Sequence, residues 1–236
     1  MTTRSIRKSD IVADLVIENP GLARVFESFG INYCCGGNRP LEEAANEKGI
    51  DADALVIVLN VGLSGPNGRG VPNPASLSTA ELVDHIVETH HAYLKKELPR
   101  LVQLTRKVAD SHGDQDPRLH EVAEVVARLA AELSRHLESE ESELFPVISG
   151  CGVGAGSGEV CGTARPAVPV VEQLLAEHNE TGRMLESLRA ATDDFTLPDW
   201  GCNTYRAMLA GLEELEQDTR EHVHLENDAL FPRVVA

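Results

Sequence analysis

Residues 136–146 read HLESEESELFP, and residues 222–232 read HVHLENDALFP. Each segment has a histidine followed four residues later by a glutamate, and each ends in Leu-Phe-Pro at the same offset. Upstream, His91 precedes His136 by 45 positions, and His178 precedes His222 by 44. The second half of this region therefore repeats the first, which is typical of two helical hairpins related by an approximate two-fold axis.

The repeated pattern predicts a metal centre. Positions i and i+4 lie on one side of an α-helix, so His136 and Glu140 point the same way, and so does the second pair. If the apolar faces carry these groups inward, a Leu/Val core receives imidazoles and carboxylates, which is costly without a cationic partner. We predict two metal ions, each with two histidines, and both glutamates bridging the ions. The predicted ligands are His91, His136, Glu140, His178, His222 and Glu226.

The number of ligands bears on the identity of the metal. Four imidazoles and two bidentate carboxylates provide about eight bonds, and zinc prefers about four ligands per ion, so a dizinc site would be closed and structural. Six-coordinate iron would keep open positions even with an oxo or hydroxo bridge, which the charge of two ferric ions favours. We expect two iron ions with such a bridge, and zinc and manganese remain alternatives.

Glycine and proline divide the rest of the chain. Residues 1–62 are predicted to form a small N-terminal domain of short helices, although β-branched residues in 51–60 (DADALVIVLN) leave a strand open. Residues 63–77 are rich in Gly, Pro, Asn and Ser and are predicted to be a linker. Ser78 begins a capping-box motif, and the last two of four long amphipathic helices are expected at about 168–191 and 199–229. We predict an all-α protein whose residues 78–236 form a four-helix bundle.

Composition excludes several classes of partner. The 38 acidic residues outnumber the 21 basic residues and give a formal charge of −17, which argues against nucleic acid or an anionic membrane as a partner. No apolar run approaches the ~20 residues of a membrane span, and no signal-peptide core follows the N-terminus. Five unevenly spaced cysteines do not form a secreted disulfide framework. We expect a soluble cytoplasmic protein; the oligomeric state is not indicated.

Cys34 and Cys35 precede Gly36 and Gly37 in a turn between short helices. A vicinal disulfide would strain the intervening peptide, so two free thiols are expected. A buried structural pair is one interpretation. The open backbone at the two glycines and the reactivity of thiolates toward soft metals and nitrosating agents favour a functional pair, whose role stays open.

The remaining histidines and cysteines give weaker predictions. His112 ends a helix and is expected either to cap it or to lie beside the metal ligands. Histidines without a repeat partner are expected at the surface or at helix ends, namely His85, His90, His120 and His224. Cys151 and Cys161 lie in a Gly-rich insertion that we interpret as functionally silent rather than as a disulfide or metal clamp, and Cys202 is expected to be packed.

Five segments, INYCCGG, LVDHIVETHH, ELSRHLESEESELFP, LAEHNETG and DTREHVHLENDALFPR, together resemble the hemerythrin-like diiron proteins called repair-of-iron-centres proteins. The resemblance implies a hemerythrin-like bundle in which the six predicted ligands hold a non-haem diiron centre. It places His112 at a family position of unassigned role and implies that the thiol pair works with the diiron domain. The long linker and the Gly-rich insertion depart from the family pattern.

The resemblance also implies a function and partners. Such proteins restore iron–sulfur clusters damaged by nitric oxide or peroxide, by supplying iron, so damaged iron–sulfur proteins are the expected partners. The alternative is a module that binds, scavenges or reduces nitric oxide or dioxygen, and a structural dizinc bundle is the third interpretation. Iron delivery and gas chemistry need the same ligands, so the sequence leaves both open, and with them the question of enzymatic turnover.

Overall fold

The computed structural model describes residues 5–62, 74–149 and 168–235. These residues are helical throughout their regular elements, with a single isolated β-bridge between Ile11 and Pro40, so the all-α prediction is confirmed. Most of the predicted linker and the insertion with Cys151 and Cys161 lie outside the described residues.

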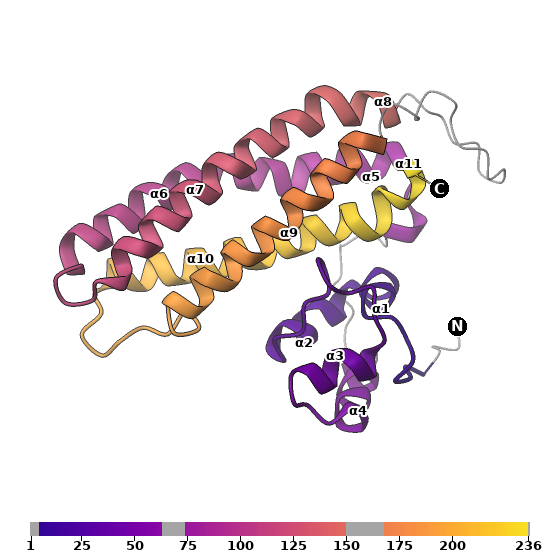
Figure 1. Ribbon diagram of the computed structural model, residues 1–236, viewed down its shortest axis with the longest axis horizontal. Helices are drawn as coiled ribbons and strands as arrows, with labels where there is room; N and C mark the ends of the chain where they lie inside the picture. Colours follow the sequence, from indigo (N-terminus) through magenta and orange to yellow (C-terminus); the bar gives the residue numbers. More distant parts are fainter. Residues whose placement is uncertain (1–4, 63–73, 150–167, 236) are drawn as a thin grey trace.

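Four long helical paths lie side by side as a bundle (Figure 1). The first path consists of α5 (Thr79–Ile86), η3 (Val87–His91) and α6 (Ala92–His112). The second consists of α7 (Arg118–Ser139), η4 (Glu140–Leu144) and α8 (Phe145–Ser149). The third is α9 (Val168–Ala191), and the fourth consists of α10 (Asn203–His224), η6 (Leu225–Leu230) and α11 (Pro232–Val235). The capping box predicted at Ser78 is present, because Ser78 and Glu81 bond each other's backbone N–H groups.

The interior of the bundle contains two apolar clusters. The larger fills the half towards the α6–α7 turn and includes Leu101, Leu129 and Leu212. The smaller lies towards the chain's C-terminus and includes Ile86 and Phe231. The predicted metal ligands lie where the two clusters meet along the helical paths: His136 is next to Leu137 of the larger cluster, and Glu226 is next to Leu225 of the smaller one. They form a polar layer at the boundary of the two clusters.

The N-terminal residues form a small domain with its own core. Its helices are α1 (Val12–Glu18), η1 (Pro20–Leu22), α2 (Ala23–Ser28), α3 (Leu41–Glu47) and α4 (Ala52–Gly62). Gly30 and Gly49 follow α2 and α3 with φ of 62° and 68°, which explains why glycine stops both helices. The strand alternative for residues 51–60 is wrong, since all but the first of them lie in α4. Val223 of α10 belongs to this domain's core, so the domain packs on the fourth helical path (Figure 1).

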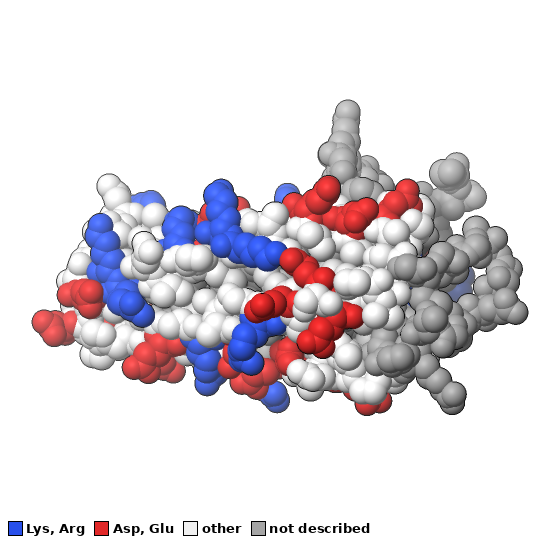
Figure 2. Space-filling model, turned by 90° about the horizontal axis from the view of Figure 1, so that it is seen from above, with Lys and Arg blue, Asp and Glu red and all other residues white. Residues whose placement is uncertain are grey.

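The surface is charged, as the composition predicts. On the face shown in Figure 2, Lys and Arg side chains lie from the left end to the centre, interspersed with Asp and Glu, whereas the charged side chains to the right of centre are Asp and Glu. No helix in the described parts of the chain is both long enough and apolar enough to cross a membrane.

Candidate metal centre

The six predicted ligands meet in the polar layer. His91, Glu140, His222 and Glu226 have no exposed surface, and His178 and His136 are 1% and 4% exposed. They come from all four helical paths, although the two histidine–glutamate pairs are 86 positions apart in sequence. The fold therefore brings together the residues that the internal repeat singled out.

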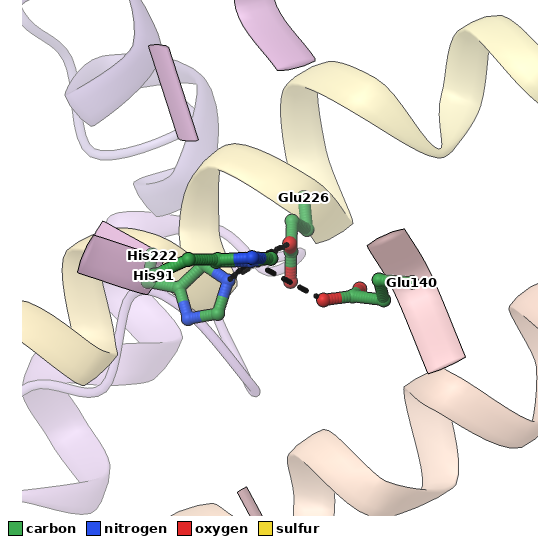
Figure 3. A group of neighbouring side chains, drawn as sticks. All are labelled: His91, Glu140, His222 and Glu226. Carbon is green, nitrogen blue, oxygen red and sulfur yellow. Dashed lines mark hydrogen bonds and ion pairs between the residues drawn. The ribbon is translucent and has the colours of Figure 1, made fainter. Parts of the chain in front are cut away.

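The side chains form two groups that share both glutamates. One group is His91, Glu140, His222 and Glu226 (Figure 3), and the other is His136, Glu140, His178 and Glu226. Within each group, the potential ligand atoms all lie within 4.8 Å of one another. Each group takes one histidine from each half of the repeat. This arrangement suits two cations bridged by the two carboxylates.

The distances within the layer are short. His222 Nε2 lies 2.8 Å from Glu226 Oε1, and His178 Nε2 lies 3.2 Å from Glu226 Oε2. Glu140 Oε2 lies 3.4 Å from His136 Nε2 and 3.5 Å from His91 Nε2. All four histidines thus turn Nε2 towards the carboxylates.

Local π-helical geometry accompanies the ligands. His91 ends the π-helix η3, Glu140 begins η4, and Glu226 is the second residue of η6. A π-helical turn widens the helix and redirects side chains, and such turns occur frequently at functional sites. The equivalent segments of the two halves, η4 and η6, are both π-helical, so the two halves share this backbone geometry as well as their sequence pattern.

The outer ring nitrogens of three of the predicted ligands are fixed by neighbouring oxygens. Nδ1–H of His91 donates to Glu141 at 2.7 Å, and Nδ1–H of His136 donates to Glu177 at 2.9 Å. Nδ1–H of His178 donates to Asn227 Oδ1 at 2.7 Å. These bonds set the tautomer, which leaves the Nε2 lone pair for a metal ion.

Sequence reasoning missed these three oxygen-bearing residues. Glu141 and Asn227 directly follow Glu140 and Glu226, and Glu177 directly precedes His178. The only signal in the sequence was therefore that each of these residues is adjacent to a predicted ligand. This signal is weak, because a charged or amide residue on a helix is ordinarily exposed to solvent.

The electrostatics of the layer reflect crowded, buried charges. Burial lowers the pKa of His91, but the negative charges of the nearby Glu140 and Glu226 carboxylates outweigh the effect of burial and raise this pKa to about 10. Burial likewise opposes protonation of His136, and the two glutamates raise its pKa to about 9. Burial lowers the pKa of His222 to about 3. Burial and the neighbouring Glu226 raise the pKa of Glu140.

A metal ion fits this donor set. Both carboxylate oxygens of Glu140 and Oε2 of Glu226 are buried and accept no hydrogen bond. Buried carboxylate oxygens without donors are costly, and cations between the carboxylates would satisfy them. Imidazole nitrogens with carboxylate oxygens suit iron, zinc or manganese.

Comparison with known proteins agrees with this geometry. The hemerythrin HHE cation binding domain family matches residues 82–234. The chain belongs to the hemerythrin HHE family. A second family, described as a domain of unknown function (DUF542), matches residues 8–61. The resemblance stated from the sequence is confirmed.

Relatives of this hemerythrin-family chain match it over nearly its whole length. An iron-sulfur cluster repair protein ScdA of Staphylococcus epidermidis is 31% identical, covering 97% of this chain and 99% of the relative. A probable iron-sulfur cluster repair protein of Haemophilus influenzae is 32% identical, covering 95% and 96%. An iron-sulfur cluster repair protein YtfE of an Enterobacter species is 33% identical, with the same coverage.

The thiol pair lies against α9, the helix that carries the predicted ligand His178. Cys34 and Cys35 are free thiols with their sulfurs 3.5 Å apart, and Cys35 Sγ–H donates to the backbone oxygen of His178 at 3.5 Å. A hydrogen bond from Cys35 and the charge of Arg220 lower the pKa of the Cys34 thiol, against the effect of burial. The same bond raises the pKa of Cys35. Cys34 is therefore the readier thiolate, although Cys35 is the more exposed.

Two of the unpaired histidines differ from the sequence prediction. His90 is 4% exposed, donates from Nδ1 to Asp218, and stacks on His222. His224 is 3% exposed because the N-terminal domain covers it, with Tyr33 edge-on to its ring. Tertiary packing buries both, so the expectation of a surface position is wrong for them, although His224 is the last residue of α10 and thus lies at a helix end as the other alternative had it. His85 is half-buried and His120 is exposed.

His112 lies far from the predicted metal ligands. It is the last residue of α6, whereas His91 directly precedes this helix of 21 residues, and a rise of 1.5 Å per residue separates the two by about 30 Å. The alternative that placed His112 beside the ligands is therefore wrong. Its Nε2 lies 3.2 Å from Cys202 Sγ. Cys202 is only partly packed, and its sulfur caps α10 by accepting from the Tyr205 N–H.

Proposed function

We propose that this protein restores damaged iron–sulfur clusters in other proteins by supplying iron from a centre of two iron ions. The proposed ligands are the six buried residues of the polar layer, of which Glu140 and Glu226 would bridge the two ions. An oxo or hydroxo group would be a further bridge, as the sequence predicts. The observation that carries the proposal is the pair of four-residue groups sharing both glutamates. The relatives named as iron-sulfur cluster repair proteins support the choice of recipient.

The surroundings of the proposed centre suit a metal ion that is released from the protein. Glu141, which holds His91, also lines a surface pocket of about 380 Å³ together with Lys95 and Glu138. Acidic groups at this pocket and the net charge of −17 attract cations. Iron bound through His91 is therefore one hydrogen-bonded residue away from an open, acidic surface.

The proposal gives the thiol pair a part in repair. Cys35 touches the backbone of His178, so the pair lies beside one end of the proposed centre. Replacing Cys34 and Cys35 by serine should leave the iron content unchanged and abolish cluster repair. Normal repair by the double variant would remove the thiols from the proposal.

Isotope transfer tests iron supply directly. The protein is loaded with isotopically labelled iron and incubated with an iron–sulfur enzyme damaged by nitric oxide, under conditions without other iron. We expect enzyme activity to return together with labelled iron in the rebuilt cluster. Glu226→Ala should fail in both respects, whereas Glu143→Ala, at an exposed position of the same segment as Glu140, should behave as the parent. Recovery without label would contradict iron supply and favour gas handling.

A further inference from the structure

The side chain of Asn227 joins the thiol turn to the metal centre. Its Oδ1 accepts from His178 Nδ1–H at 2.7 Å, and its Nδ2 donates to the backbone oxygen of Cys34 at 2.9 Å. These two bonds use the acceptor and a donor of a single amide. A ligand of the bundle and a carbonyl of the N-terminal domain are thus two hydrogen bonds apart.

The internal repeat shows what is special about this amide. Glu141 follows Glu140 as Asn227 follows Glu226, and it accepts from His91 in the same way. The other bonds of Glu141 go to the ammonium group of Lys95. A carboxylate has no proton to donate at neutral pH, so a glutamate at this position could accept from the histidine but could not bond the carbonyl, whereas the amide of Asn227 does both.

The thiol turn can transmit a movement of the Cys34 carbonyl to both sulfurs. Asn32 Oδ1 accepts from the backbone N–H groups of Cys34 at 3.1 Å and Cys35 at 3.0 Å, which ties the turn into one unit. The turn also lies close to α9, because a Cβ added at Gly182 would be 3.4 Å from Cys35 Sγ. Displacing the carbonyl therefore displaces the thiols against the ligand helix.

We propose that Asn227 is a positioning residue that couples the Cys34–Cys35 turn to the ligand His178, so that metal binding and thiol reactivity influence each other. The inference rests on the proposed function only in taking His178 as a metal ligand. Metal binding would hold the His178 ring in place and, through Asn227, the turn. Because equilibrium coupling between two sites acts in both directions, blocking the thiols should in turn change the affinity for the metal.

The test measures thiol reactivity in the full chain. Cys151, Cys161 and Cys202 are replaced by serine so that only the pair reacts, and serine keeps the cap on α10. Reaction with an aromatic disulfide is followed by absorbance, without oxygen, with and without ferrous iron. We expect iron to slow the reaction about five-fold or more, in the range typical of site coupling. In Asn227→Asp, which still accepts from His178 but cannot donate to Cys34, the rates with and without iron should agree within about two-fold.

A matched control and a reciprocal measurement complete the design. Asn179→Ala removes an exposed amide beside His178 that donates to the Leu175 carbonyl. Because Asn179 also lines the surface pocket at Cys35, the control compares the ratio of the rates with and without iron, which should equal that of the parent. Alkylating the thiols should change the rate of iron loss to a chelator in the parent but not in Asn227→Ala. Helicity by circular dichroism verifies folding of each variant.

The outcomes separate this inference from the proposed function. If the parent binds iron and Asn227→Asp keeps the parent's rate ratio, the coupling through Asn227 is refuted while the metal centre stands. An unchanged thiol rate on iron binding in the parent refutes it as well. If the parent takes up no iron, the proposed function itself fails.

Discussion

Replacing a shared glutamate should remove both metal ions, whereas replacing a histidine should remove one. Glu226 belongs to both four-residue groups, and His136 belongs to one. Even residues that only orient a ligand contribute 10–100-fold to metal affinity, so a lost ligand should weaken binding about 100-fold. At free iron ten times the dissociation constant, the parent should bind about 1.8 irons per chain, His136→Ala about 1.0 and Glu226→Ala about 0.2.

The assay is equilibrium dialysis against ferrous iron without oxygen, with iron counted per folded chain. Glu143→Ala should match the parent, because Glu143 is exposed although it lies in the same π-helix as Glu140. Equal iron contents in His136→Ala and Glu226→Ala would refute the sharing of glutamates, whatever the absolute affinity. The comparison therefore tests the arrangement of the ligands and not merely their presence.

Three further predictions concern the thiols and the core. Hydrogen bonds from the backbone N–H of Tyr205 and from His112 lower the pKa of Cys202 to about 7, so the alkylation rate of Cys202 should reach half its maximum near pH 7. His112→Ala should move this midpoint to higher pH, and a midpoint near pH 9 in the parent would contradict the contact between His112 and Cys202. Replacing Arg220 by glutamine should raise the pKa of Cys34 and slow its alkylation at neutral pH, and an unchanged rate would exclude the guanidinium as a cause. Leu129→Ala, at a fully buried position of the larger cluster, should lower the free energy of unfolding in urea by about 2–5 kcal/mol, and a loss below about 1 kcal/mol would contradict close packing there.

The helices and the convergence of the six residues could be predicted because their signals are local and repeated. Histidine and glutamate four residues apart share a helix face regardless of what surrounds the helix. Two copies at matching distances from an upstream histidine then require a common interior. The ligand roles themselves await the iron measurements.

The contacts around the six residues could not be predicted, because they depend on tertiary packing. His224 is buried only because the N-terminal domain covers it, and nothing near it in sequence records this. His112 looked similar to other helix-end histidines, and only the length of α6 separates it from the centre. The contact between Cys35 and His178 joins residues 143 positions apart, and the predicted linker between the two domains gives no sign of how they pack on each other.

The sharing of each group between the two halves has a consequence for assembly. One hairpin carries His91, His136 and Glu140, and the other carries the remaining three residues, so neither alone contains a complete group. A free hairpin of this kind could complete its pair of cation sites only by associating with another copy, at a concentration-dependent affinity. Joining two such units in one chain makes that encounter intramolecular, so the effective concentration of each half for the other no longer depends on how much protein is present.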